Sequence, residues 1–142
     1  MDFDRAKSLV ELNRLRYGSR DWDFASPFAG YALRHVPVRD LSLANLSTLL
    51  RQGIGADFLM LVVIERLEQN PLVRATHTEG DLLTVALRAD ALVWKRNPAY
   101  RERIAKVWKK IAPRLAAANN PAHHTLFSDY RWFLKAGSFL PA

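Results

Sequence analysis

The sequence contains no cysteine, and this absence excludes several classes of function. Disulfide scaffolds, thiolate metal sites and cysteine nucleophiles all need that residue. Long apolar runs are missing as well. The longest is Phe58–Ile64, whereas a membrane-spanning helix needs roughly 20 apolar residues. The N-terminal stretch is charged and lacks the apolar segment of a secretory signal. We therefore expect a cytoplasmic protein with no membrane span.

What is present fits an ordinary globular domain. The chain has 142 residues, of which 49% are hydrophobic and 25% are charged. At this length, folding removes roughly two-thirds of the surface of the unfolded chain from water, so a sizeable core can form. Global disorder is excluded by this composition. We expect one domain over residues 1–142.

The charge balance is the unusual feature of the composition. There are 21 Lys and Arg against 14 Asp and Glu, which gives a net charge of +7. Residues 1–50 carry a net +1, residues 51–94 a net −2 and residues 95–142 a net +8. Strongly basic proteins often bind nucleic acid or anionic membranes. Here nearly all of the excess belongs to the last third of the chain.

Apolar residues recur at helical spacing, and no convincing strand pattern is present. The pattern predicts an all-α domain of about seven helices. Residues 58–69 are apolar on every side in their first two turns, which places them at the centre of the domain. The predicted helical segments are 3–17, 27–35, 43–52, 58–69, one from about 82, a short one carrying Trp94, one from Pro98, and 123–135.

Residues that begin and end helices support these limits. Ser42 and Asp57 are expected to cap the two helices that follow them. Residues 36–40 are expected to be an extended link, because a residue before proline avoids helical geometry. Asn70-Pro71 should end the central helix. Pro113 should kink the predicted helix that begins at Pro98 or mark its end.

No catalytic, metal or cofactor motif is recognisable. The sequence has no GxSxG, P-loop, GxGxxG or HExxH motif. Its histidines are not at ligand spacing, and the acidic pair Glu79 and Asp81 is more typical of helix capping than of acid–base catalysis. We expect no catalytic residue, no metal and no cofactor, and thus a protein that is not an enzyme. The histidines are His35, His77, His123 and His124.

Nucleic-acid binding is the alternative function. Residues 41–67 have the rhythm of a helix-turn-helix, but the second helix offers seven apolar side chains where base contacts would be made. The basic helix 99–114 retains enough exposed cations for non-specific phosphate contacts. A basic helical nucleic-acid-binding module therefore stays open as a second hypothesis.

The middle of the chain, over about residues 22–98, carries a series of short motifs. The Gln52-Gly53-x-Gly55 turn between two helices is followed by Gly80-Asp81-Leu82-Leu83 and then by a tryptophan. The other positions of the series are Val36-Pro37-Val38, Leu41-Ser42, Leu46, Leu49-Leu50, Leu59, Leu67, Asn70-Pro71 and Trp94. In these residues the chain resembles the immunity proteins of bacterial contact-dependent growth inhibition (CDI) systems. The positions specify a helical scaffold, so the resemblance implies a role and leaves the binding site open.

The role implied by the resemblance is binding, without turnover, of a toxin domain. Such a partner is expected to be a nuclease held in a 1:1 complex with its active site occluded. Many antidotes to nucleases present carboxylates, and this chain departs from that pattern by being basic. The favoured candidate surface is acidic: Asp57, Glu65, Glu68, Glu79 and Asp81, with Asp21, Trp22 and Asp23 as a smaller patch. The alternative is the basic surface of Arg103, Lys106, Lys109 and Lys110.

Overall fold

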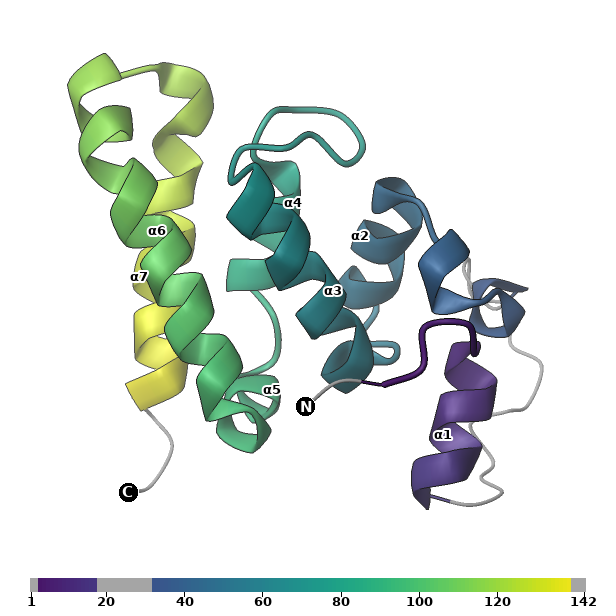
Figure 1. The fold of residues 1–142 in the computed structure, drawn as a ribbon. Helices are drawn as coiled ribbons and strands as arrows, with labels where there is room; N and C mark the ends of the chain where they lie inside the picture. Colours follow the sequence, from purple (N-terminus) through teal and green to yellow (C-terminus); the bar gives the residue numbers. More distant parts are fainter. Residues whose placement is uncertain (1–2, 18–31, 139–142) are drawn as a thin grey trace.

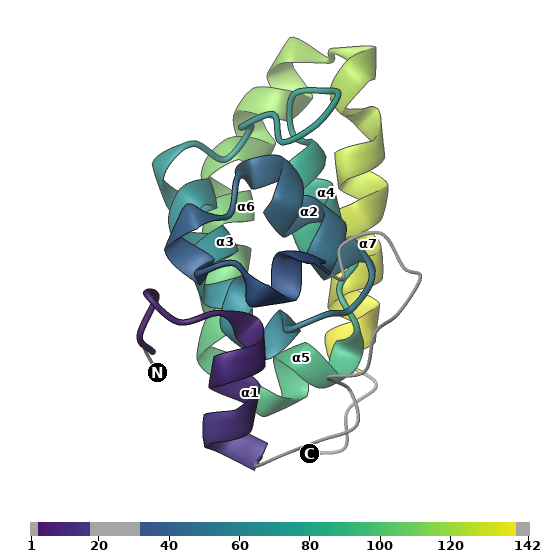
Figure 2. The same cartoon turned by 90° about the vertical axis from the view of Figure 1, so that its right-hand side faces the viewer.

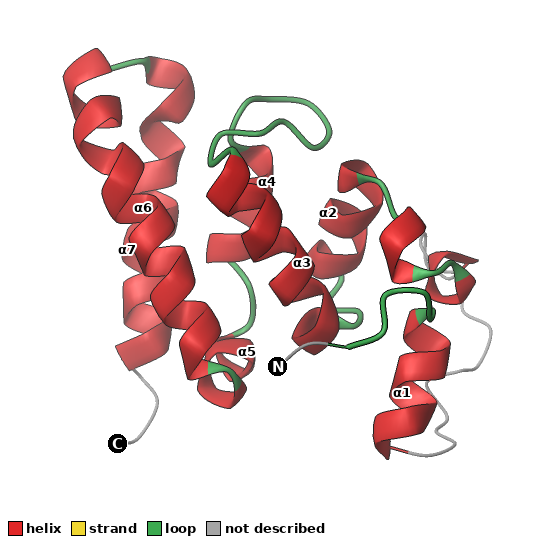
Figure 3. Cartoon of the chain, viewed as in Figure 1, coloured by secondary structure: helices red, strands yellow, loops and turns green. Residues whose placement is uncertain are grey.

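A computed structural model describes residues 3–17 and 32–138, and all seven α-helices named below lie in these ranges. No β-strand occurs within them, and the sole extended pairing there is an isolated bridge between Ser8 and Pro37 (Figure 3). The predicted all-α fold is confirmed. No helix in the described ranges has the length and apolarity needed to cross a membrane. Predictions for Asp21, Trp22 and Asp23 lie outside the described residues.

The elements follow one another with short connections. The α-helices are α1 (Leu9–Tyr17), α2 (Leu43–Arg51), α3 (Ala56–Gln69), α4 (Asp81–Leu87), α5 (Ala91–Arg96), α6 (Pro98–Ala118) and α7 (His124–Ser138). Three 3-10 helices accompany them: η2 (Ala32–His35), η3 (Val38–Asp40) and η4 (Pro121–His123).

Helix α3 forms the centre of the molecule. Every side chain from Phe58 to Ile64 is buried, and Leu67 joins them one turn later. The helix contacts α2, α4, α5 and α6. In two perpendicular views, α6 and α7 run side by side along one flank of α3, while α1 lies on the other flank (Figures 1 and 2). The prediction of an apolar central helix is confirmed.

The first helix begins six residues later than the sequence pattern predicts. The Ser8 hydroxyl accepts a hydrogen bond from the Glu11 amide, and the Glu11 carboxylate accepts one from the Ser8 amide. This reciprocal capping box starts α1 at Leu9. Residues before it use their carbonyls elsewhere: Lys7 accepts from the Val38 amide at 3.0 Å. A Ser-x-x-Glu signal was present in the sequence to indicate this start.

Two further predicted segments differ from the structure. Residues 36–40 were expected to be extended, but η3 occupies Val38–Asp40, with the Leu41 amide bonded to the Val38 carbonyl at 3.1 Å. Pro37 precedes this turn with a φ of −52°, a value that also suits entry into a helix. Of the helix predicted over 27–35, the described part is the 3-10 turn η2.

Helix α2 begins with the predicted cap, and α3 begins with a cap that differs from the prediction. Ser42 and Asn45 form a capping box at the start of α2, which confirms the Ser42 prediction. Asp57 does not cap α3, because Gly55 takes that position with a φ of +65°. A Cβ at Gly55 would lie 2.7 Å from the Leu9 side chain, so close packing of α1 also requires glycine here.

Helices α6 and α7 form a hairpin with an aromatic interior. Trp108 stacks on Tyr130 with ring centroids 4.8 Å apart, and it meets Phe127 edge-on at 5.1 Å. Such pairs add roughly 0.5–1.5 kcal/mol each beyond the area they bury. Helix α6 continues through Pro113 to Ala118 and ends at Asn119, which has a φ of +48°. Pro113 therefore does not mark the end of the helix.

Candidate functional site

The carboxylate of Asp57 ties the start of α3 to the end of α5. It accepts hydrogen bonds from Arg96 Nε at 3.2 Å and from Asn97 Nδ2 at 2.9 Å. The Asp57 side chain is only 17% exposed, while Arg96 is half exposed. This carboxylate therefore holds two helices together.

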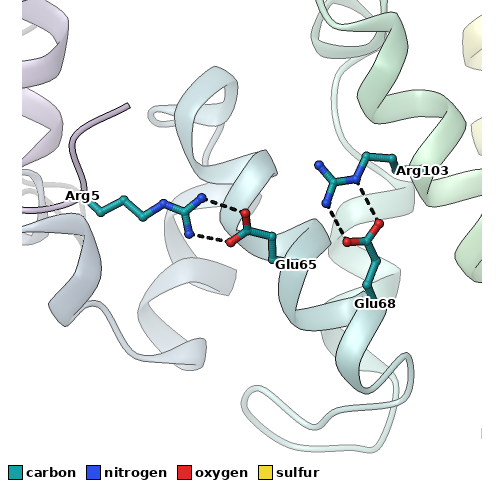
Figure 4. Close-up of polar contacts among 4 residues, drawn as sticks. All are labelled: Arg5, Glu65, Glu68 and Arg103. Carbon is teal, nitrogen blue, oxygen red and sulfur yellow. Dashed lines mark hydrogen bonds and ion pairs between the residues drawn. The ribbon is translucent and has the colours of Figure 1, made fainter. Parts of the chain in front are cut away.

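Glu65 and Glu68 lie in the last turns of α3 and are paired with arginines from two different elements (Figure 4). Arg5 donates to both Glu65 oxygens at 2.5 and 2.8 Å. Arg103 of α6 donates to both Glu68 oxygens at 2.6 and 2.9 Å. The Arg103 guanidinium lowers the pKa of Glu68, and Glu68 raises the pKa of Arg103. The two carboxylates brace α3 against the N-terminal segment and against α6.

Asp81 organises the loop that precedes α4. Its carboxylate accepts hydrogen bonds from the amides of residues 75–78 and from the Thr76 hydroxyl. Burial opposes ionisation, but the amides of Ala75, His77 and Thr76 and the Thr76 hydroxyl outweigh it. They hold the pKa of Asp81 well below its usual range. The sequence suggested that Asp81 serves the amides of its own helix, whereas it serves those of the preceding loop.

Glu79 reaches from the same loop to the α6–α7 connection. Its Oε1 lies 3.1 Å from His123 Nε2. The His123 side chain is buried and that of Glu79 is 64% exposed. Throughout the described chain, no three His, Cys, Asp or Glu side chains are grouped so that they could hold a metal ion.

The predicted acidic surface is thus distributed over internal contacts. All five of its described carboxylates have hydrogen-bond partners within the chain, in the N-terminal segment, the α3–α4 loop, η4 and the α5–α6 region. The partners lie up to 60 positions away in the sequence, and charge counting along the chain cannot reveal them. Whether these residues bind a partner protein remains a prediction.

The predicted basic surface has a different arrangement. Arg103 is committed to Glu68, but the next three cations of α6, Lys106, Lys109 and Lys110, are exposed. Arg114 is exposed on the same helix. None of these four makes a hydrogen bond or ion pair with the residues that the structure describes. The opposite face of α6 is buried, with Tyr100, Ile104, Val107, Trp108, Ile111 and Leu115.

A groove between α2, α4 and α7 was not anticipated from the sequence. It encloses about 500 Å³ and is bordered by Leu50, Val85 and Trp132. The Arg88 guanidinium lies 5.6 Å from the centre of the Trp132 ring and bonds to buried Asp129 at 2.8 Å. Of the three tryptophans in the described ranges, Trp132 is 37% exposed while Trp94 and Trp108 are buried. Aromatic and arginine side chains in this setting are typical of protein-binding surfaces.

A family model described as CDI immunity proteins matches residues 27–104, more than half of the chain. This span runs from before η2 into the first third of α6. No curated protein and no solved structure matches the chain.

Proposed function

Because the chain belongs to the family of CDI immunity proteins, we propose that it binds the toxin domain of its own contact-dependent growth inhibition system and neutralises it. The partner we expect is a nuclease domain, held in a 1:1 complex with its active site occluded, in the cytoplasm of the cell that makes the immunity protein. The observation that carries this proposal is the family match over residues 27–104.

The physical character of the domain supports a binding role. Its core is continuous from α1 to α7, and the polar side chains of the predicted acidic surface are engaged in holding elements together. A pre-formed scaffold of this kind loses little conformational entropy when it docks. A standard interface covers about 800 Å² on each partner. That is roughly a tenth of the 8151 Å² accessible surface of this protein.

The test uses the toxin domain encoded with this chain. Cells that express the toxin domain are expected to survive when the chain is co-expressed and to die with an empty vector. The two proteins are expected to co-purify, with native mass spectrometry giving one copy of each. Adding the chain to purified toxin domain should abolish its nuclease activity.

An unfolded variant tests whether protection requires the folded chain. The variant Leu61→Asp places a carboxylate in the core of α3 and should fail to protect. Cell death in the presence of the folded wild-type chain would overturn the proposed function. A complex in which the toxin domain keeps its activity would overturn occlusion of the active site.

A further inference from the structure

The carboxylates and the cations of this protein differ in how many of them have hydrogen-bond or ion-pair partners within the chain. Nearly every carboxylate in the described ranges accepts a hydrogen bond or forms an ion pair, including Asp57, Glu65, Glu68 and Asp81. Asp40 and Glu102 are the exceptions among the described residues. Four of these carboxylates, those of Asp57, Glu65, Glu68 and Asp129, form ion pairs with arginines, so their charge is compensated inside the fold.

Exposed cations without a described ion-pair partner occur on several elements, and α6 carries a run of them. Lys106, Lys109, Lys110 and Arg114, here called the α6 stripe, are exposed and have no described ion-pair partner. At 1.5 Å per residue they span about 12 Å along the helix axis. At 100° per residue Lys106 and Lys109 lie opposite the buried face, while Lys110 and Arg114 lie on the flank that also carries Arg103. Glu102, one turn before Lys106, is the one unpaired carboxylate on α6.

We propose that the α6 stripe is the surface that contacts the toxin domain and that the toxin presents an acidic surface to it. This inference rests on the proposed function and names the chemistry of the partner. Exposed charges without internal partners produce a field that extends into solvent, which speeds the encounter with an opposite charge. Carboxylates tied up in internal pairs, such as Glu65 and Glu68, produce little of such a field.

The stripe is held rigidly in position. The buried face of α6 packs on α3 and α5, and Trp108 packs on the aromatic residues of α7. Arg103 fixes the helix to Glu68 immediately before the stripe begins. The cations therefore project from a fixed backbone, and only their side chains must be ordered when a partner docks.

A protein is favoured over a nucleic acid as the partner. Single-stranded nucleic acids are usually held by basic grooves in which exposed aromatic rings stack on the bases. The two aromatic residues of α6, Tyr100 and Trp108, are both buried, so the stripe offers no stacking surface. Membership of an immunity family supports a protein partner as well.

The test compares two triple charge reversals. The stripe variant is Lys106→Glu, Lys109→Glu and Lys110→Glu. The control is Arg74→Glu, Lys95→Glu and Arg131→Glu, which changes the net charge equally at exposed cations on a loop, α5 and α7. Circular dichroism and thermal unfolding establish that both variants are folded. Surface plasmon resonance then measures association with a catalytically inactive toxin domain at low and at physiological salt.

The stripe variant is expected to associate at least about tenfold more slowly than wild type, with a weaker salt dependence, and to lose protection in cells. The control is expected to stay within about twofold of wild type. Replacing acidic residues on the toxin surface by lysine should restore binding to the stripe variant. That rescue would identify the complementary surface.

Three results would overturn the inference. Wild-type association by the stripe variant would place the interface elsewhere and leave the proposed function intact. Equal loss in both variants would show that net charge matters and that the stripe does not. If RNA or DNA binds the wild type but not the stripe variant, while toxin binding is unchanged, the stripe is a nucleic-acid surface. Failure of the wild-type chain to bind the toxin domain would instead overturn the proposed function.

Discussion

The carboxylates of α3 and the lysines of α6 lie on neighbouring helices and are used in opposite ways. Glu65 and Glu68 are partly exposed, yet each makes a two-bond ion pair with an arginine brought in from a distant part of the chain. Lys106 and Lys109 are exposed and make no described pair. The first set connects elements of the fold, and the second is left available to solvent and partners.

This difference shows why net charge is a poor guide to a binding surface. The middle segment is acidic by count and the last third is basic by count. After folding, Glu65 and Glu68 are paired with Arg5 and Arg103, whereas Lys106 and Lys109 of α6 have no described partner. Charge reversal at Glu65 and Glu68 would break two internal contacts and would not be a clean test of binding.

The largest effect on the free energy of unfolding is expected from Leu61→Asp, since α3 carries the paired carboxylates and also supports α6. Leu61 is 5% exposed in the core, and a buried unpaired carboxylate costs several kcal/mol. We expect a loss of at least about 4 kcal/mol, enough to unfold an ordinary domain. Urea titration followed by circular dichroism measures it. Leu92→Asp, at a half-exposed position of α5, is the control and should remain folded.

Asp81→Asn tests a carboxylate that accepts hydrogen bonds from the α3–α4 loop and forms no ion pair with the residues that the structure describes. The amide nitrogen of asparagine cannot accept the loop hydrogen bonds, so we expect a loss of about 2–3 kcal/mol. Because folding lowers the pKa of Asp81, its contribution is fully present above the unfolded value near 4. That contribution is lost as the pH falls from there toward the lower folded value.

Urea unfolding measured from neutral to acid pH checks whether the contribution of Asp81 to stability decreases as the pH falls. The stability difference between wild type and Asp81→Asn should shrink as the solution is acidified below pH 4 or so. The matched control is Asp40→Asn, at an exposed carboxylate without such contacts, and it should change the stability at neutral pH by less than about 0.5 kcal/mol. A constant difference between wild type and Asp81→Asn over the whole range would contradict the assignment.

A smaller effect is expected from the α3–α6 ion pair. Glu68 and Arg103 are 39% and 35% exposed, so solvent screens much of their attraction. A double-mutant cycle with Glu68→Gln and Arg103→Gln should give a coupling of about 0.5–1 kcal/mol that weakens in high salt. Zero coupling at low salt would show that the Glu68–Arg103 ion pair does not stabilise the contact between α3 and α6.

The smallest effect on stability should come from the stripe itself. Lys106→Gln combined with Lys109→Gln removes two charges that have no described partner, so unfolding free energy should change by less than about 0.5 kcal/mol. A larger loss, measured by urea titration, would show that these lysines stabilise the fold through interactions with other residues, as the α3 carboxylates do.

The helical fold could be predicted well, because apolar spacing and capping residues are local signals. Ser42 and Asn70-Pro71 act as expected, and the run from Phe58 to Ile64 is buried as expected. Apolar periodicity alone predicts a start of the first helix at residue 3, which is too early because the Ser8–Glu11 capping box sets the start of α1 at Leu9.

The candidate site could be predicted far less well, since it depends on contacts between distant positions. Arg5 and Glu65 are 60 residues apart, and Glu68 and Arg103 are 35 apart. A single sequence shows that these residues are charged but not which of them neutralise each other. Exposure of Trp132 beside Arg88 likewise depends on how α4 meets α7.

The enclosure of α3 by α2, α4, α5 and α6 has a consequence for amide hydrogen exchange. Amides from Phe58 to Ile64 have no local route to solvent, so we expect them to exchange through global unfolding of the domain. A partner that binds only the folded state adds RT ln(1 + [L]/Kd) to that unfolding free energy, wherever it docks. Slowed exchange in α3 therefore measures affinity, while amides that change elsewhere locate the docking face.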